Sequence, residues 1–314
     1  MTTFIITLSN LIPLYLIILI GFLLSKKISC CKQTISSILI YILTPIVVFQ
    51  GISTLQLNSN DLLLPLGFFS LACLISTIFL FKSPKNQLSP ISTFSSGTAN
   101  VGYFGLPVIL SILGNEAFSL AILCILGFVL YENTLGYIIA TNNKNPFKKL
   151  IRHPFIHAFI AGIIIKLLNI EINQNLNFVL DNFKATYSTL GMLIIGIGIN
   201  DLSKAKINYK YLKITLLAKF LIWPIISLLF ILTDIYITKL LSQQSHIIIL
   251  IFSFAPIAAN TVAYASLLQL ETKSVSFAVL ISTILSLFLI PSSITIFNYF
   301  SDTKVLIASL DGLL

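Results

Sequence analysis

The chain has 314 residues, of which 57% are hydrophobic and 9% are charged, and its mean hydropathy is +1.00. Soluble domains carry about 25% charged residues, so this composition excludes a sizeable soluble domain and indicates a polytopic membrane protein. The net charge of +9 does not indicate a nucleic-acid partner, because the basic residues are scattered over short loops. The lipid bilayer is the expected partner.

Ten apolar segments are candidates for crossing a hydrocarbon layer of about 30 Å. The first follows residues 1–3 without the basic stretch of a signal peptide, so it is expected to remain as a span. The sixth is short and needs a thinner bilayer or cover from neighbouring helices. In chain order the predicted spans are Phe4–Leu24, Thr34–Thr54, Leu62–Phe81, Ile91–Leu113, Ala117–Ala140, Pro154–Leu168, Phe178–Ile199, Tyr211–Ile235, His246–Leu270 and Ser274–Asn298.

The seventh span contains three glycines, which typically permit close approach between membrane helices. They are Gly191, Gly196 and Gly198.

The basic residues of the loops predict the orientation. Loops after the odd-numbered spans are rich in lysine, whereas loops after the even-numbered spans carry almost none. Positive loops stay in the cytoplasm, so we expect a multi-pass protein of the cell (inner or plasma) membrane with both termini outside the cytoplasm. The basic residues that set this orientation are Lys26, Lys27, Lys32, Lys82, Lys85, Lys144, Lys148, Lys149, Arg152, Lys204, Lys206, Lys210 and Lys213.

A basic loop at residues 141–153 separates two sets of five spans. Because five is odd, the second set must cross the membrane in the opposite sense to the first. The predicted fold is therefore all-α, with ten transmembrane helices in two inverted five-helix repeats. The first repeat covers residues 1–140 and the second 154–298, with the cytoplasmic linker 141–153 between them and a short C-terminal tail at 299–314.

Spans four and nine both carry residues that interrupt a helix inside the membrane. Glycine and proline loosen helices, and unsatisfied backbone groups in hydrocarbon cost several kcal/mol unless protein or water pairs them. Two interrupted segments at corresponding positions of two halves indicate the binding site of a secondary transporter. The interrupting residues are Gly97, Asn100, Gly102, Gly105 and Pro107 in span four, and Pro256, Asn260 and Thr261 in span nine.

Asn100 and Asn260 are the leading candidates for substrate contacts. A broken helix offers the N-terminus of its second half, whose partial positive charge favours an anion, and an amide can donate to a carboxylate without adding a buried charge. Alternatively each asparagine caps its broken helix, and the two roles are compatible. The full predicted substrate-binding set is Asn100, Gly102, Tyr103, Gly105, Pro107, Pro256, Asn260 and Thr261, in which Gly102, Gly105 and Pro107 are expected mainly to shape the backbone.

Glu132 in span five and Lys219 in span eight lie at similar predicted depth. An isolated charge there costs at least about 2.5–3.5 kcal/mol, and pairing would reduce that cost. We therefore predict charge coupling between these two residues. The alternative is a snorkelling lysine and a carboxylate that faces the cytoplasm.

No cofactor or metal site is expected. The histidines His153, His157 and His246 have no metal-ligand spacing, and the four cysteines form no CxxC motif. No catalytic set is apparent inside the membrane, so an enzymatic function is not expected. The alternatives to a secondary transporter are a channel-like uniporter and an integral-membrane enzyme.

The interrupted spans resemble those of the auxin efflux carrier family, which includes plant PIN carriers and bacterial permeases. The chain departs from the family at Gly191-Met192, where members often carry Ala-Pro. The most specific matching segments are Ala99–Gly102, Gly105–Pro107, Leu113–Glu116, Ala255-Pro256, Asn260-Thr261, Lys219–Pro224 and Ile281–Ser286.

This resemblance implies that helices four and nine cross at unwound centres. It further implies a scaffold made of spans one, two, six and seven, with the remaining spans forming a transport part. The implied substrate is a small organic anion, auxin in plants and a mono- or dicarboxylate such as malate in bacteria. A homodimer is also implied.

Overall fold

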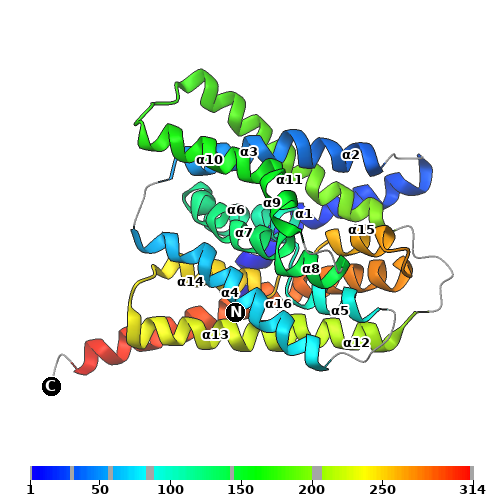
Figure 1. The fold of residues 1–314 in the computed structure, drawn as a ribbon. Coiled ribbons are helices and arrows are strands. Elements are labelled where there is room, and N and C mark those ends of the chain that lie inside the picture. Colours follow the sequence, from blue (N-terminus) through cyan, green and yellow to red (C-terminus); the bar gives the residue numbers. More distant parts are fainter. Residues whose placement is uncertain are drawn as a thin grey trace.

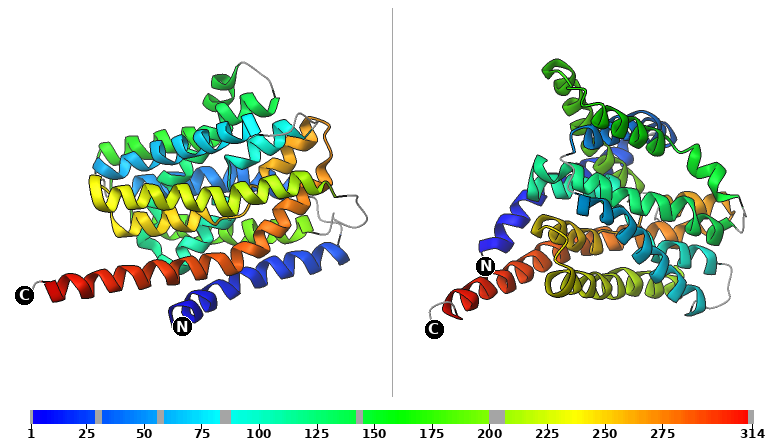
Figure 2. Two further views of the ribbon diagram at one scale, coloured as in Figure 1. Left: turned by 90° about the horizontal axis from the view of Figure 1, so that it is seen from below. Right: turned by 60° about the vertical axis from the view of Figure 1, so that its left-hand side comes forward.

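The computed structural model describes residues 2–28, 32–55, 59–82, 88–141, 145–199 and 207–311, and within these ranges the chain forms helices and turns but no strand. Most of the long helices run roughly side by side in one bundle (Figures 1 and 2). The prediction of an all-α fold is thereby confirmed for the described residues. Seven helical stretches are long and apolar enough to cross a membrane, namely Phe4–Lys27, Gln33–Ser53, Asn60–Phe81, Ser89–Leu113, Asn115–Thr141, Tyr209–Thr238 and Thr272–Tyr299.

The first half of the chain forms helices over each of the five predicted span ranges. They are α1 (Thr2–Lys27); α2 (Lys32–Ile38), η1 (Leu39–Leu43) and α3 (Thr44–Ser53); η2 (Ser59–Leu62) and α4 (Leu63–Lys82); α5 (Ser89–Ser96), η3 (Val101–Gly105) and α6 (Leu106–Leu113); and η4 (Asn115–Ala117), α7 (Phe118–Asn133) and α8 (Leu135–Thr141).

The second half also begins with helices, the first of which lies in the basic linker. The elements are α9 (Pro146–Ile151); α10 (Pro154–Leu167); α11 (Gln174–Ile199); α12 (Tyr209–Leu217), η6 (Ala218–Ile222), α13 (Trp223–Thr233) and η7 (Asp234–Thr238); α14 (Gln243–Ser253) and α15 (Asn260–Leu267); and α16 (Thr272–Asp311). Helix α16 continues through residues 299–311, the predicted tail, and its end extends past the bundle (Figure 2).

Three of the ten predicted spans are not among the seven long apolar stretches. Helix α10 is apolar but has only 14 residues. Helix α11 has 26 residues but carries the ion pair between Asp181 and Lys184 (2.8 Å). The ninth predicted span is divided into α14 and α15, each too short to cross a bilayer alone.

Glycines bring α11 close to its neighbours. A Cβ atom on Gly196 would lie 1.9 Å from the Ile18 carbonyl oxygen of α1, and one on Gly21 of α1 would lie 2.3 Å from the Leu193 carbonyl oxygen. A Cβ on Gly191 would lie 3.1 Å from backbone atoms of Tyr103. The prediction of close packing by span-seven glycines is confirmed at Gly191 and Gly196.

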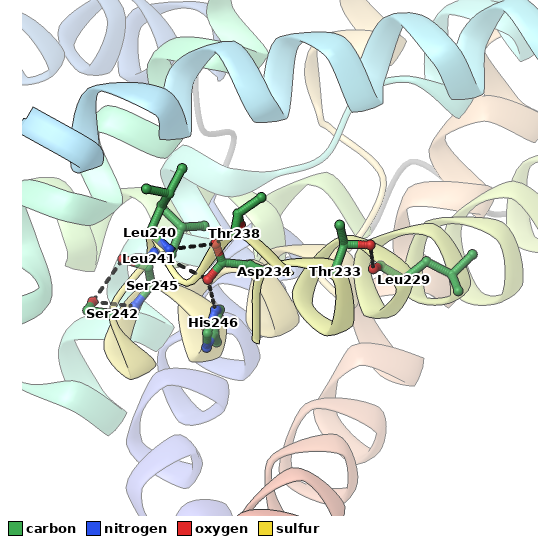
Figure 3. A network of polar contacts seen from close by, with 9 residues as sticks. All are labelled: Leu229, Thr233, Asp234, Thr238, Leu240, Leu241, Ser242, Ser245 and His246. Carbon is green, nitrogen blue, oxygen red and sulfur yellow. Dashed lines mark hydrogen bonds and ion pairs between the residues drawn. The ribbon is translucent and has the colours of Figure 1, made fainter. Parts of the chain in front are cut away.

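A buried polar cluster fixes the turn between η7 and α14 (Figure 3). The carboxylate of Asp234 accepts from the Leu240 and Leu241 backbone N–H groups at 3.0 and 3.2 Å and contacts His246 Nε2 at 2.8 Å. Lys239, which follows η7 and precedes Leu240, has a positive φ of 52°. The carboxylate of Asp234, in contact with His246, thus pairs two backbone N–H groups of the tight turn between η7 and α14.

Candidate functional site

The predicted break in span four lies between α5 and η3. Residues 97–100 are not helical, and the Asn100 carbonyl oxygen accepts from Gly105 N at 2.9 Å, which starts the second half of the helix. Pro107 lies in the first turn of α6, directly after η3. A backbone that bends at Gly97 and restarts at Asn100 therefore divides this span into two half-helices.

The break in span nine lies directly against the break in span four. Residues 254–259 separate α14 from α15, and within them the Pro256 carbonyl oxygen accepts from Asn100 N at 2.8 Å. A backbone N–H group in the break of span four is thus paired with a backbone carbonyl in the break of span nine. The segments that the sequence marked as interrupted are brought into contact by the structure.

Two side chains of the eighth predicted span donate to backbone carbonyls that the two breaks leave without a helical partner. Trp223 Nε1 donates to the Ser96 carbonyl oxygen at the end of α5 (2.7 Å), and Lys219 Nζ donates to the Phe252 carbonyl oxygen at the end of α14 (3.2 Å). Lys219 and Trp223 are four residues apart, so one face of this span caps the C-terminal ends of both first half-helices.

Two serines of α16 complete the pairing on the span-nine side. Ser286 Oγ donates to the Phe254 carbonyl oxygen at 2.7 Å, and Ser282 Oγ accepts from Ile257 N at 3.0 Å. Buried irregular backbone is tolerated at membrane depth only when its polar groups are paired in this way.

A cavity of about 420 Å³ opens beside the junction of the two breaks. Its wall is mainly apolar, with polar groups gathered where the half-helices begin. The lining residues are Ile40, Thr44, Val47, Val48, Ala99, Asn100, Val101, Gly102, Tyr103, Leu106, Ile122, Ile125, Phe128, Val129, Glu132, Asn133, His153, Phe155, Tyr187, Ala258, Ala259, Asn260, Ala263 and Tyr264.

Both second half-helices present their N-terminal ends to this cavity. Residues 99–103 line it at the start of η3, and residues 258–260 line it at the start of α15. Helix N-termini carry partial positive charge and N–H donors. The cavity therefore has two electropositive ends of backbone on its wall, although no lysine or arginine is among the lining residues that the structure describes.

The two asparagines occupy the cavity differently. The Asn100 side chain is 5% exposed, and its Nδ2 has no hydrogen-bond partner among the residues that the structure describes. Asn260 is exposed at the cavity wall, where its Nδ2 donates to Glu132 Oε2 at 2.9 Å. A buried amide donor without a partner is costly in a folded protein, so Asn100 Nδ2 is a ready position for an acceptor atom of a ligand.

Glu132 joins the two breaks. Its Oε1 accepts from Thr98 Oγ1 in the break of span four, while its Oε2 accepts from Asn260 at the start of α15. It lies in the last turn of α7, just before Thr134, where the predicted fifth span is interrupted between α7 and α8. This kink was not predicted from the sequence.

The remaining predicted site residues lie outside the cavity wall. Gly105, Pro107, Pro256 and Thr261 are buried outside the cavity wall. Lys219 is 1% exposed and contacts the Phe252 carbonyl and the Trp223 ring, at 4.9 Å from its centroid. The direct ion pair considered between Lys219 and Glu132 is therefore not formed. Instead of a carboxylate, the Lys219 amino group contacts a backbone carbonyl at the end of α14.

Sequence reasoning missed several polar contributors to the cavity and its rim, among them Thr98, Tyr187 and His153. Thr98 holds Glu132, Tyr187 lines the wall with its ring 5.8 Å from that of Tyr103, and His153 lines it from the start of α10. Only Thr98 carried a signal, because it lies between Gly97 and Asn100 in the interrupted stretch. Tyr187 comes from the seventh predicted span, which contains no break, and His153 comes from the end of the linker, just before α10. No cluster of three potential metal ligands occurs within the described residues.

Comparison with known proteins assigns the chain to a family. A family model described as a membrane transport protein matches residues 6–294. The chain is 26% identical over 297 residues to a protein of Methanocaldococcus jannaschii named as an uncharacterized transporter, a match that covers 88% of this chain and 94% of that protein. The chain therefore belongs to the family of membrane transport proteins that includes the auxin efflux carriers.

Proposed function

We propose that this membrane transport protein is a secondary transporter that carries a small organic anion, such as a mono- or dicarboxylate, by alternating access. The observation that carries the proposal is the unpartnered Asn100 Nδ2 beside two half-helix N-termini. These groups favour an acceptor with negative charge, and a largely apolar cavity of about 420 Å³ suits a small organic molecule.

We further propose that ten helices form two inverted five-helix repeats, with both termini outside the cytoplasm. The helix packing supports this. If each span of the first half is matched with the span five places later, each packed pair below corresponds to a second packed pair made of the matching spans. The corresponding helix pairs are α1–α11 and α10–α3, α4–α5 and α13–α14, and α4–α7 and α12–α16. The proposed scaffold, the transport part and the homodimer rest on family resemblance.

Counterflow tests the proposed function. Purified protein is reconstituted into liposomes loaded with unlabelled acetate, lactate, malate or indole-3-acetate, and the same labelled compound is added outside. We expect transient accumulation of at least one labelled carboxylate above its equilibrium level, because an alternating site exchanges internal for external substrate.

Protein-free liposomes provide the baseline. A channel-like uniporter would equilibrate the label without the transient excess. Exchange of none of these carboxylates, by protein shown to be folded, would refute the proposed substrate class.

A further inference from the structure

Glu132 is the acidic side chain among the described residues that line the cavity, and it is 8% exposed. It lies in the last turn of α7, where the helix dipole disfavours a negative charge. Its position is close to the start of α15, where the dipole favours one. The carboxylate of Glu132 therefore takes the place that an incoming anion would be expected to occupy.

Glu132 and a bound carboxylate would compete for the same hydrogen-bond donors. Both of its oxygens accept hydrogen bonds, one from Thr98 and one from Asn260 Nδ2, as an ionised carboxylate does. A substrate carboxylate drawn to Asn260 and the start of α15 would need the same donors. Two carboxylates that share one poorly solvated site cannot both remain ionised without a large electrostatic cost.

We propose, resting on the function proposed above, that Glu132 takes up a proton when an anionic substrate binds, so that the cavity binds one carboxylate together with one proton. The proton comes from solvent and goes to a Glu132 carboxyl oxygen. The neutral acid releases Asn260 for the substrate and adds an O–H donor to the site. Asn100 Nδ2, which lacks a partner without substrate, supplies a further donor.

Other titratable groups face the same region. Tyr103, Tyr187 and Tyr264 line the cavity, and Tyr131 precedes Glu132 on α7. Their phenols are already protonated at neutral pH, so they take up no further proton. His153 lines the cavity and its Nδ1 accepts from Phe155 N at 3.3 Å. Because histidine can take up a proton near neutral pH, His153 is the competing proton acceptor, although protonation of its Nδ1 would break the bond from Phe155 N. The test must separate His153 from Glu132.

Proton uptake on binding measures the proposed coupling. The carboxylate that exchanges in the counterflow assay, from acetate, lactate, malate and indole-3-acetate, is titrated into weakly buffered purified protein while a pH indicator records proton uptake. We expect the wild-type protein to take up about one proton per carboxylate bound near neutral pH. Its affinity should fall by up to about tenfold per pH unit as pH rises, as linkage to one proton requires.

Two variants locate the proton. Glu132→Gln keeps an acceptor for Thr98 or Asn260 and should bind with little proton uptake and a flat pH dependence. His153→Gln alters the cavity wall and is free to change the affinity, but it should still take up about one proton per carboxylate bound. Binding by wild-type protein without proton uptake would overturn the proposal, as would loss of uptake in His153→Gln alone. The wild-type result and His153→Gln decide the matter even if Glu132→Gln does not fold. Absence of carboxylate exchange in counterflow would instead refute the proposed function.

Discussion

Replacing Asn100 by alanine is expected to weaken carboxylate binding about 10- to 100-fold, the value of one hydrogen bond to a charged group. The reason is that Asn100 lines the cavity and its buried Nδ2 has no hydrogen-bond partner among the described residues, so a substrate oxygen that reaches it would be its acceptor. The backbone bonds of Asn100 to Pro256 and Gly105 do not involve the side chain and should persist. Affinity is measured by calorimetric titration of the carboxylate that exchanges in counterflow.

Two further variants sharpen this prediction. Asn100→Asp replaces the donor by a charged acceptor and should reduce anion binding more than Asn100→Ala does. Asn182→Ala removes the same group from an exposed position of α11 and should bind as the wild type does. If Asn100→Ala lowers the unfolding temperature but leaves the affinity unchanged, the asparagine only stabilises the break.

Replacing Lys219 by methionine is expected to lower the free energy of unfolding by about 1 kcal/mol, because the Phe252 carbonyl at the end of α14 loses one donor and keeps the backbone N–H of Ala255. Thermal unfolding in detergent measures the change. Lys213→Met, at an exposed position of α12, is the matched control and should have little effect. An unchanged or raised stability in Lys219→Met would mean that the cost of burying the amino group exceeds its value as a cap.

The double variant Lys219→Met with Glu132→Gln distinguishes the observed contacts from the pair expected from the sequence. A salt bridge between these residues would make the double variant more stable than the sum of the single losses. Because Lys219 caps α14 and Glu132 instead joins Thr98 to Asn260, we expect the losses to add within about 0.5 kcal/mol.

The sequence located both helix breaks because their chemistry is local. Gly97 and Pro256 lie in the two breaks, and glycine and proline disfavour a continuous helix. Proline alone is not sufficient, because α1 and α16 continue through Pro13 and Pro291. The crossing of the two breaks was implied by the family resemblance, and the hydrogen bond from Asn100 N to the Pro256 carbonyl oxygen holds the breaks in contact. By contrast, α16 runs on to Asp311 because no glycine or proline interrupts residues 292–311.

The partners of the buried charges could not be predicted in the same way. A span pattern gives the depth of Lys219 and Glu132 but not the direction in which each side chain points. It also does not mark backbone carbonyls as partners, although every broken helix frees several. Half of the predicted substrate-binding set, Gly105, Pro107, Pro256 and Thr261, accordingly lies outside the cavity wall, because break-forming residues shape a site without lining it.

The central claim is that substrate occupies the cavity at the junction of the two breaks, and protection from alkylation tests it most directly. Ala263→Cys places a thiol in the cavity wall, and Ala161→Cys places one on an exposed face of α10 outside that wall. Both are made in a chain whose four native cysteines are replaced by alanine, and reaction with N-ethylmaleimide is timed. At a carboxylate concentration about ten times its Kd, we expect alkylation to slow about tenfold at Ala263→Cys, because few sites remain empty, and to be unchanged at Ala161→Cys. Equal rates at Ala263→Cys with and without a carboxylate that exchanges in counterflow would place the substrate elsewhere.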